Sequence, residues 1–347
     1  MGEGIMSKVL VLIQGREVAA SRYRILQYIP YLEEHGLECE VMDFPDSFGQ
    51  YMFLARILPS FDCVFVQRKR FHFPFLRLFR QRARKVVYDL DDAVMFKNTL
   101  ADSPHSKTRQ RRFANMVRLC DRVIAGNSFL KEKASAYNPC VEVIPSSIPS
   151  EKYRLRDYSG NSDMVTIGWI GDHGSIHYLL RIKGVLESIG RKYRGRVKLR
   201  IICDTFFDLE HLPVEKLQWS EAGEVSDLQG IDIGVMPLTD DPWSWGKCGL
   251  KILQYFGVGV PAVCTPVGVN RDVVTQGVTG YWAMTEQEWV DKLSLLIEDA
   301  GSRKAMGLNG RQVLDEGYTR EVNAPRILDI IRCKSVSRTG ERLEWQG

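Results

Sequence analysis

The sequence predicts an α/β protein of two domains, each built on a parallel sheet, and three observations lead to this prediction. Short apolar runs alternate with amphipathic helical segments along the chain, as is typical of parallel α/β domains. The alternation occurs in two series, separated by a polar stretch at 152–163 that has the composition of a linker. A chain of 347 residues is also long enough to bury two cores.

The elements follow from the apolar runs in order. In the first series we expect strands at 9–13, 39–42, 63–67, 86–90, 122–125 and 141–144. A helix is expected over 22–35, ended by Gly36. In the second series we expect strands at 165–170, 197–203, 217–219, 231–237, 262–265 and 280–283. Further helices are expected over 250–258, stopped by Gly259, and from 318 to about 333.

Composition excludes several classes of protein. Hydrophobic residues make up 44% of the chain and charged residues 26%, as in an ordinary globular protein. No apolar run has the length of a membrane span, so we expect a cytoplasmic protein. The eight cysteines form no C-x-x-C pair, which favours reduced thiols. His173 and His177 have no further histidine or cysteine nearby, so they are interpreted as surface residues and no metal site is expected.

One segment has the local pattern of a phosphate site. The expected strand at 231–237 leads through Asp240 and Asp241 to the loop WGKCG at 245–249, which opens the helix at 250–258. Backbone N–H groups, the positive end of a helix dipole and lysine side chains would then meet at one place. Lys247 and Lys251 are the lysines in question.

The same segment resembles a known family. The run GLKILQYFGVGVPAVCTPVGVNRDVV, continued by GVTGYW, resembles the donor-binding segment of retaining glycosyltransferases of the GT-B fold. It is most similar to the bacterial lipopolysaccharide and phosphatidylinositol mannosyltransferase-like enzymes (glycosyltransferase family 4-like). Other stretches resemble further landmarks of that family and extend the resemblance over most of the chain: VLVLIQG with ASRYRILQYIPYLEEHG, VVYDLDDAVMF, VIAGNSFLKEKA, VIPSSI, EWVDKLSLLIED and MGLNGRQVLDEGYT.

The resemblance implies a fold and an activity. The fold would be GT-B, with two Rossmann-like domains facing each other across a cleft. Residues 1–155, joined by the helix at 318–333, would form the acceptor-side domain, and 163–317 would bind a nucleotide-sugar donor. The enzyme would be a hexosyltransferase that retains the anomeric configuration and needs no metal or cofactor. The acceptor would be a glycan, a lipid-linked molecule or a small molecule. A nucleotide-sugar epimerase of the same fold, or a donor-binding protein without transfer activity, are the alternatives.

The sequence departs from the family at two positions. Most members have two glutamates, eight positions apart, that contact the donor sugar and the ribose, whereas this chain has Gly246 and Gln254. Gln254 can still form a hydrogen bond to a ribose hydroxyl, but Gly246 can contact a sugar only through its backbone. Asp240 and Asp241 are candidates for the missing carboxylate. Lys247 and Lys251, next to Gly249, would replace the arginine and lysine that many relatives place on the diphosphate.

Loops that follow other strands supply the remaining candidates, because ligands of open α/β sheets bind beyond the carboxyl ends of the strands. Gly15 would allow close approach of the backbone to a ligand and Arg22 could reach phosphate, although a plain turn is an alternative. Gly171, Asp172 and Ser175 form a glycine-containing loop that opens a helix, a weak signal that the lysines nearby strengthen.

Three aspartates follow the expected strand at 86–90. Asp89, Asp91 and Asp92 would repel one another unless they face water, cations or ligand hydroxyls. We expect Asp91 or Asp92 to orient an acceptor hydroxyl. A helix N-cap with solvated neighbours and a metal cluster are the alternatives. The predicted catalytic residues are therefore Asp91, Asp92, Lys247 and Lys251.

The run RKRFHFPFLRLFRQRARK at 68–85 contains eight Lys or Arg residues and no acid. One interpretation is an amphipathic surface helix with its apolar side on the domain core. The other is a surface for anionic lipid on the inner face of a membrane. Nucleic acid is not an expected partner, because the net charge of the chain is only +4 and no nucleic-acid motif is present.

Overall fold

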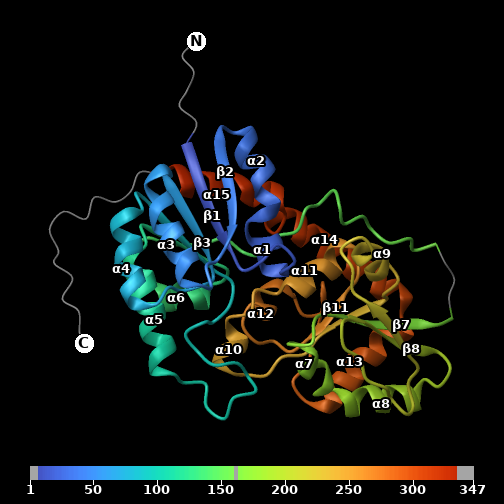
Figure 1. Cartoon of the computed structure of the whole chain (residues 1–347). Coiled ribbons are helices and arrows are strands. Elements are labelled where there is room, and N and C mark those ends of the chain that lie inside the picture. Colours follow the sequence, from blue (N-terminus) through green and yellow to red (C-terminus); the bar gives the residue numbers. More distant parts are fainter. Residues whose placement is uncertain (1–6, 160–162, 334–347) are drawn as a thin grey trace.

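The computed structural model describes residues 7–159 and 163–333. The chain folds into two parallel six-stranded sheets, each with helices on both faces (Figure 1). The first sheet has the order β2-β1-β3-β4-β5-β6. Its strands are β1 (Ser7–Ile13), β2 (Leu37–Asp43), β3 (Cys63–Gln67), β4 (Val86–Leu90), β5 (Arg122–Ala125) and β6 (Val141–Val143). The second sheet has the order β12-β11-β10-β7-β8-β9. Its strands are β7 (Val165–Ile170), β8 (Val197–Cys203), β9 (Val214–Gln218), β10 (Ile233–Met236), β11 (Ala262–Cys264) and β12 (Gly280–Trp282).

The helices connect these strands. Those in the first half are α1 (Ala19–Arg24), η1 (Leu26–Tyr28), α2 (Ile29–Glu34), α3 (Phe48–Ile57), η2 (Leu58–Ser60), α4 (Phe73–Arg82), α5 (Lys107–Leu119) and α6 (Ser128–Ser135). Those in the second half are α7 (Ile176–Leu180), α8 (Lys183–Lys192), α9 (Glu224–Gln229), α10 (Pro242–Trp245), α11 (Leu250–Gly257), α12 (Asn270–Val273), α13 (Glu286–Glu298), α14 (Ala300–Gly317) and α15 (Arg320–Arg332). We call the layers around β1–β6 the first domain and those around β7–β12 the second domain.

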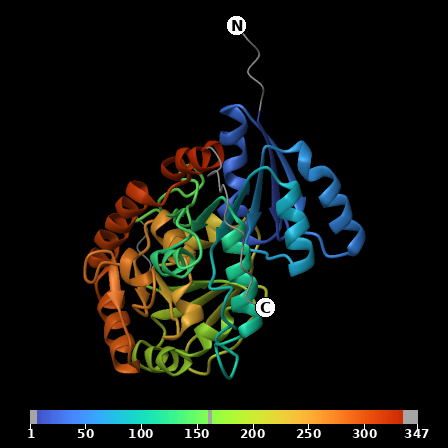
Figure 2. The same cartoon turned by 90° about the vertical axis from the view of Figure 1, so that its left-hand side faces the viewer.

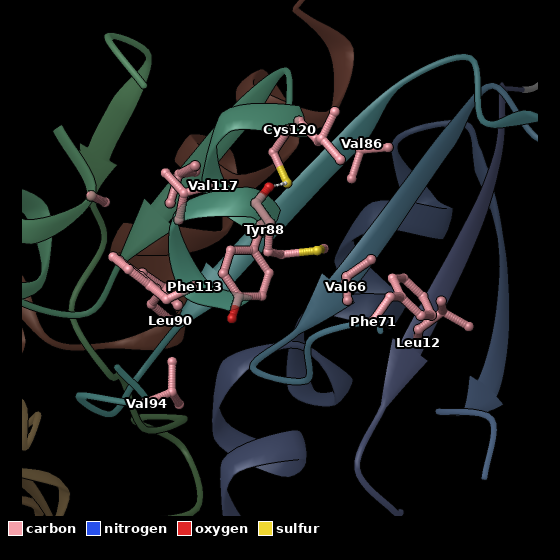
Figure 3. Packing of buried hydrophobic residues seen from close by; sticks show 14 of the residues in the cluster. Leu12, Val66, Phe71, Val86, Tyr88, Leu90, Val94, Phe113, Val117 and Cys120 are labelled. Atoms are coloured by element: carbon pink, nitrogen blue, oxygen red, sulfur yellow. Dashed lines mark hydrogen bonds between the residues drawn. The ribbon is translucent and has the colours of Figure 1, made fainter. Parts of the chain in front are cut away.

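Each sheet is apolar on both faces, which explains why its strands are continuous apolar runs in the sequence. In β1, Leu10 and Leu12 face one core, whereas Val9, Val11 and Ile13 face the other. This alternation follows from the two-residue period of a strand. Figure 3 shows the first of these cores, where Leu12, Val66 and Tyr88 from the sheet pack near Phe71 and Phe113.

The end of the chain packs on the first domain. Ile327 and Ile331 of α15 belong to the same core cluster as Val9 and Val11 of β1, and α15 lies against the first domain in both overall views (Figures 1 and 2). Lys85 Nζ donates hydrogen bonds to the carbonyl oxygens of Ile330 and Ile331, at 2.7 and 2.8 Å. Such bonds satisfy carbonyl groups that the end of a helix leaves free.

The chain therefore crosses between the domains twice, and the two crossings lie side by side. Ile148 N donates to Tyr318 O at 3.1 Å, and Arg320 N donates to Ile148 O at 2.9 Å. A paired crossing of this kind holds the two sheets near each other while leaving few backbone bonds between them.

The single helix expected over 22–35 is wrong, because the structure divides this segment into α1, η1 and α2. Pro30 lies in the first turn of α2. It has no N–H to donate to Leu26, and its ring crowds the preceding turn, so a continuous helix is interrupted there. The expected strand at 217–219 also lies earlier, at β9, because this edge strand contains the polar pair Glu215 and Lys216 and gives little apolar signal.

One side of the basic run at 68–85 packs into the core of the first domain. Phe71, Leu76 and Phe79 are buried in the core of the first domain, so α4 is an amphipathic helix with its apolar side inward. Its cationic side faces outward, with Arg77 and Arg82 exposed. No helix among the described residues is both long and apolar enough to cross a membrane.

Candidate functional site

The loops at the carboxyl ends of the two sheets meet, and this is where most predicted site residues lie. In the second sheet the strand order reverses between β7 and β10, and open α/β sheets bind ligands at such a point. The loop after β7 contains Gly171, Asp172 and Ser175. The loop after β10 leads through α10 to Lys247 and the start of α11. The topology thus brings both predicted phosphate loops to one edge of the sheet.

The N-terminus of α11 presents free donors. Gly249 is its N-cap, with φ of +69°, a conformation that glycine adopts without strain. The backbone N–H groups of Leu250 and Lys251 donate to no partner in residues 7–159 and 163–333. The first N–H groups of a helix and its dipole together attract an anion.

Lys251, in the first turn of α11, is the least compensated charge of this region. Its Nζ lies 5.4 Å from the centre of the Trp169 ring, and no described carboxylate pairs with it. Burial lowers the pKa of Lys251 to about 8, and Asp172 opposes this shift only in part. A partly buried ammonium of lowered pKa is stabilised when an anion approaches it.

The loop after β7 is fixed by its own contacts. Ser175 Oγ donates to Asp172 Oδ1 at 2.6 Å and accepts from Asp172 N at 3.2 Å. Gly171 lies against the Trp169 ring, where an added Cβ would come within 2.1 Å of a ring carbon. Asp172 and Ser175 therefore hold the loop, and Gly171 makes room for the indole under Lys251.

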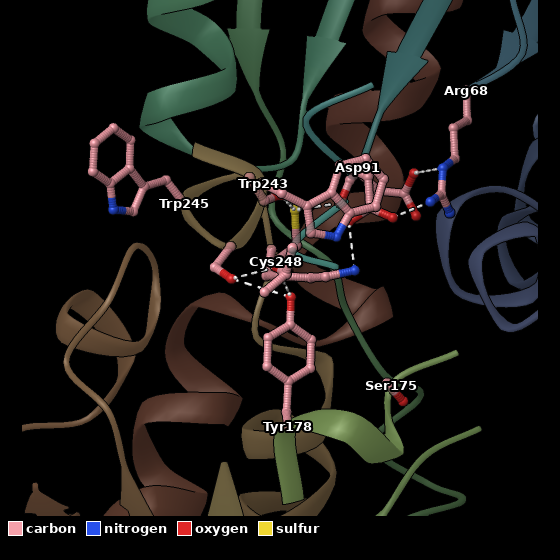
Figure 4. A network of polar contacts seen from close by, with 12 residues as sticks. Arg68, Asp91, Ser175, Tyr178, Trp243, Trp245 and Cys248 are labelled. Atoms are coloured by element: carbon pink, nitrogen blue, oxygen red, sulfur yellow. Dashed lines mark hydrogen bonds and ion pairs between the residues drawn. The ribbon is translucent and has the colours of Figure 1, made fainter. Parts of the chain in front are cut away.

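Lys247 points to the first domain instead of to open space. Its Nζ lies 2.9 Å from Asp92 Oδ1, and Arg68 forms ion pairs with both Asp92 and Asp91 (Figure 4). Burial alone would lower the pKa of Lys247, but Asp92 raises it above its ordinary value. Burial alone would raise the pKa of Asp92, but Lys247 and Arg68 bring it below its ordinary value.

Protein cations therefore lie next to the aspartates at the end of β4 and in the loop after it. Asp89 is fully buried and accepts hydrogen bonds from Arg24 Nε at 3.2 and 3.1 Å. Asp91 is less well satisfied, because its Oδ1 is buried without a hydrogen-bond partner. Burial raises the pKa of Asp91 although Arg68 opposes this. Of the three carboxylates, Asp91 is best placed to accept a ligand hydroxyl.

Three groups hold the loop 245–249, called the Gly/Lys loop below, on the first domain. Asn127 Nδ2 donates to the carbonyl oxygens of Trp245 and Lys247, at 3.1 and 3.0 Å. The thiol of Cys248 donates to Asp91 O at 3.3 Å. The Cα of Gly246 faces Ala93, so that a Cβ at this position would lie 2.5 Å from the Ala93 Cβ. A donor sugar can reach the Gly246 backbone only if the two domains move apart.

Replacing Gly246 by alanine is expected to separate the domains. The added methyl group would overlap the backbone and side chain of Ala93, and such overpacking costs about 1–3 kcal/mol. We expect a larger radius of gyration by small-angle X-ray scattering. Gly317→Ala is the control, because nothing lies within 4 Å of its Cβ position. An unchanged radius in Gly246→Ala would mean that the loop relaxes without opening the domains.

Gln254, expected at a ribose, is only 4% exposed and lies in a buried polar cluster. Its Nε2 donates to Tyr153 OH at 3.2 Å. Tyr153 and Tyr23 both donate to Glu224 Oε1 at 2.6 Å, and Trp219 Nε1 donates to Glu224 Oε2 at 3.0 Å. Burial raises the pKa of Tyr23 and Tyr153 far above the ordinary range, and the nearby Glu224 adds to this. A ribose would reach Gln254 only through a rearrangement of this cluster.

Arg22, expected at a phosphate, lies beside this cluster. The Arg22 guanidinium is 4.6 Å from the centre of the Trp219 ring and 3.8 Å from Glu221. It therefore meets an indole and a carboxylate in the second domain, and no phosphate loop. Gly15, with φ of +150°, forms the turn after β1.

Asp240 and Asp241 have separate roles. Asp241 is the N-cap of α10 and accepts hydrogen bonds from the backbone N–H groups of Trp243 and Ser244 at 2.9 Å. It also accepts from Thr99 Oγ1 of the first domain at 2.9 Å. Asp240 is exposed and accepts from Trp245 Nε1 at 2.7 Å. Only Asp240 is free to meet a ligand.

Several residues at the junction, where the loops of the two domains meet, were not predicted from the sequence. Arg68 has φ of +59°, unusual for a residue other than glycine, and it appears in the sequence only as one basic residue in a run. Asn127 is also the N-cap of α6, which its position before Ser128 indicates, but its contact with the second domain has no local signal. The same holds for Glu224, which lies in a short polar helix.

His173 and His177 were both expected at the surface, and this is correct only for His173, because both ring nitrogens of His177 are buried without a hydrogen-bond partner. His173 is exposed and its Nδ1 lies 2.6 Å from Asp204 Oδ2, whereas His177 is half-buried in α7. Within the described parts of the chain, no group of three or more His, Cys, Asp or Glu side chains is arranged to hold a metal ion.

Comparison with known proteins gives a partial family match and a clear fold match. Residues 218–313 match the family model of Glycosyl transferases group 1. No curated protein matches the chain. Solved structures match nearly the whole chain at low sequence identity, so they report on the fold.

Three of these structures illustrate the match. Anabaena HepE in complex with UDP and glucose has 16% identity and a TM-score of 0.69, covering 93% of this chain and 99% of that one. Sucrose-phosphate synthase from Thermosynechococcus elongatus has 12% identity and a TM-score of 0.70, covering 94% and 98%. The lipopolysaccharide outer core galactosyltransferase WaaB in its apo form has 12% identity and a TM-score of 0.64, covering 93% and 99%. The expected GT-B fold is confirmed, and the family match together with the fold supports a glycosyltransferase.

Proposed function

We propose that this chain is a retaining hexosyltransferase that moves a sugar from a nucleotide-sugar donor to an acceptor hydroxyl. The observation that supports this most strongly is Lys251, a partly buried lysine without a carboxylate partner at the N-terminus of α11. It lies where the order of the second sheet reverses, the usual place for a nucleotide. The family match at 218–313 includes the whole of α11.

In the proposed step, the acceptor hydroxyl oxygen forms a bond to the anomeric carbon of the donor. The bond from that carbon to the diphosphate oxygen breaks, and the nucleoside diphosphate leaves with the electron pair. The hydroxyl proton passes to an oxygen of the leaving phosphate, so that no nucleophilic side chain is needed. The free N–H groups of α11 and the ammonium of Lys251 stabilise the charge that grows on the leaving group.

The first domain supplies the acceptor side. Asp91 Oδ1 is buried without a hydrogen-bond partner and can accept a bond from the acceptor hydroxyl. Asp92 holds Lys247 at 2.9 Å, so an incoming diphosphate would compete with Asp92 for this ammonium. Exchange of Lys247 from Asp92 to the donor would couple donor binding to movement of the domains.

The proposal is tested with a panel of nucleotide sugars. UDP-sugars are the first choice, because a similar structure contains UDP and glucose. A donor that binds the folded protein raises its melting temperature by mass action, and transfer then releases the nucleoside diphosphate. Thermal stabilisation without release would indicate a donor-binding protein, and isomerised sugar that is still attached to its nucleotide would indicate an epimerase. A panel without any stabilising donor would contradict the proposal.

Removal of divalent metal ions is expected to leave transfer largely intact. Lys251 and the N–H groups of α11 provide the positive charge that a metal ion supplies in other phosphate sites. The measurement compares turnover with and without a chelator in a metal-free buffer. Loss of turnover that magnesium or manganese restores would instead assign a metal to Asp89, Asp91 and Asp92.

We also propose that the enzyme works on an anionic membrane surface. Phe48, Met52 and Phe53 of α3 are exposed, Phe48 by 81%, and α3 packs beside the cationic helix α4. Exposed aromatic side chains next to arginines are typical of peripheral membrane contact. This surface belongs to the acceptor-side domain, where a lipid-linked acceptor would arrive.

Binding to vesicles is expected to rise with anionic lipid content and to fall with salt, because salt screens exposed charges. Each exposed arginine near such a surface contributes about 1 kcal/mol, so changing Arg77, Arg82 and Arg84 together to serine should release the protein. The control variant changes Lys183, Arg194 and Arg196 of the second domain to serine, and flotation with vesicles measures both. Equal binding of the two variants would rule out this surface.

A further inference from the structure

A cavity lies between the domains, next to Trp245 at the start of the loop 245–249. Its volume is about 360 Å³, and both domains contribute to its walls. The first domain provides the start of α6, including Phe129, and the second provides Trp245, Asp240, Arg271, Asp272 and Met284. Pockets of this size hold small organic ligands.

The wall of the cavity contains a rigid aromatic face. Trp245 is 37% exposed, and its Nε1 donates to Asp240 Oδ1 at 2.7 Å. Phe129 packs against it edge to face, with the ring centres 5.5 Å apart and an angle of 75°. In Figure 4 the Trp245 ring points away from Arg68 and Asp91, on the opposite side of the loop. The indole is therefore held in one orientation and turned out of the ion-pair cluster.

The rim of the cavity offers unpaired polar groups. Arg271 and Asp272 are exposed, and their side chains have no hydrogen bond or ion pair with any described residue. Asp240 has a second carboxylate oxygen beyond the one that accepts from Trp245. Two carboxylates and one guanidinium together accept and donate hydrogen bonds over a short distance.

This combination fits a neutral sugar better than other small ligands. The C–H bonds of a pyranose ring pack against the electron-rich face of an indole, and ring hydroxyls can both donate to the carboxylates and accept from the guanidinium. The two carboxylates outnumber the one arginine, so a phosphate or another polyanion is disfavoured. The chain links the cavity to the donor side, because Trp245 immediately precedes Gly246 and Lys247.

We propose that this cavity binds a neutral sugar unit of the acceptor, which makes the acceptor a glycan. That the bound sugar belongs to the acceptor rests on the proposed function, whereas sugar binding itself can be measured separately. The sugar ring packs on Trp245, and its hydroxyls bond to Asp240, Arg271 and Asp272. The hydroxyl that is extended belongs to the neighbouring unit, closer to Asp91.

The test uses protein labelled with 5-fluorotryptophan and two reporters in one ¹⁹F NMR spectrum. The Trp245 resonance, assigned from Trp245→Phe, reports on the cavity. The Trp169 resonance reports on the donor side, because Trp169 lies under Lys251. Its assignment comes from its shift in Lys251→Gln, which leaves the indole in place. The probes are methyl glucosides, mannosides, galactosides and N-acetylglucosaminides, each titrated with and without UDP.

At least one glycoside is expected to shift the Trp245 resonance in a saturable way. Asp272→Asn and Arg271→Gln should each weaken this binding about fivefold, the effect of one lost hydrogen bond. Lys183→Gln, a charge removal on exposed α8, should leave it unchanged. If no glycoside shifts Trp245, or if the cavity variants bind as tightly as the unmodified protein, the inference is overturned.

The two reporters distinguish failure of the inference from failure of the proposed function. UDP-glucose that shifts Trp169, with no glycoside that shifts Trp245, would overturn the acceptor subsite and leave the transferase proposal standing. A glycoside that shifts Trp245, with no nucleotide sugar that shifts Trp169 or is cleaved, would support the sugar site and contradict the transferase.

Discussion

Replacing Asp89 by alanine is expected to lower the free energy of unfolding of the first domain by about 3–5 kcal/mol, the usual cost of leaving one member of a buried ion pair without its partner. Arg24 is 3% exposed and donates to both carboxylate oxygens of Asp89. Its other bond, from Nη1 to Ile144 O at 2.9 Å, cannot neutralise the guanidinium. Asp89→Ala would thus leave the buried guanidinium of Arg24 without a compensating charge.

The measurement is urea unfolding followed by circular dichroism, with hydrogen exchange of the β4 and β5 amides to assign the loss to the first domain. Asp91→Ala is the matched control, because Asp91 lies 3.8 Å from Arg68 and Arg68 keeps its pair with Asp92. The double variant Arg24→Met with Asp89→Leu should recover most of the loss, since a buried pair replaced by apolar residues of similar size is often neutral. Equal stability of Asp89→Ala and Asp91→Ala would contradict this account.

Replacing Lys251 by alanine is expected to lower kcat/KM for transfer by a factor of about 10–150, which corresponds to the 1.5–3 kcal/mol of a hydrogen bond to a charged group. Lys183→Ala, also a removal of one ammonium from the second domain, is the control. Lys247→Ala should also reduce transfer, but it additionally breaks the pair with Asp92. Near-normal turnover of Lys251→Ala would remove this residue from the donor site.

Lys251 should also give a distinctive dependence on pH. Its pKa of about 8 is lower than the ordinary 10.5 of lysine, so the folded protein binds fewer protons than the unfolded chain between these values. Stability therefore rises with pH across this window, whereas affinity for a diphosphate falls as the ammonium loses its proton. Lys251→Met should remove both pH effects and stabilise the ligand-free protein. A residue that lowers stability but is needed for binding is typical of a functional site.

The sequence contained enough information to locate the sheets and the two loops that we propose to bind phosphate. Parallel strands buried on both faces are apolar throughout, as in β1 and β7, so their positions are visible without any tertiary knowledge. Lys247 and Lys251 stand out because a lysine-rich loop opens a helix just after such a strand. The reversal of strand order between β7 and β10 then places this loop at the edge where open α/β sheets usually bind ligands.

The partners of the charged residues could not be predicted in the same way. Arg24 and Asp89 are 65 residues apart, and neither neighbourhood indicates the other. Asp92 was expected at an acceptor, yet its closest contacts are Lys247 and Arg68, because the two domains meet at Gly246 and Ala93. Such pairs depend on how two folded domains pack, and no local pattern of residues specifies that.

Calorimetric titration shows whether a nucleoside diphosphate binds at the N-terminus of α11, as we propose. UDP, GDP, ADP, CDP and TDP are each compared with the matching nucleoside, so that the difference isolates the diphosphate. We expect at least one diphosphate to bind far more tightly than its nucleoside, and Lys251→Gln to reduce this difference about tenfold or more. Equal affinities of every diphosphate and its nucleoside, or a difference that Lys251→Gln leaves unchanged, would contradict the proposal.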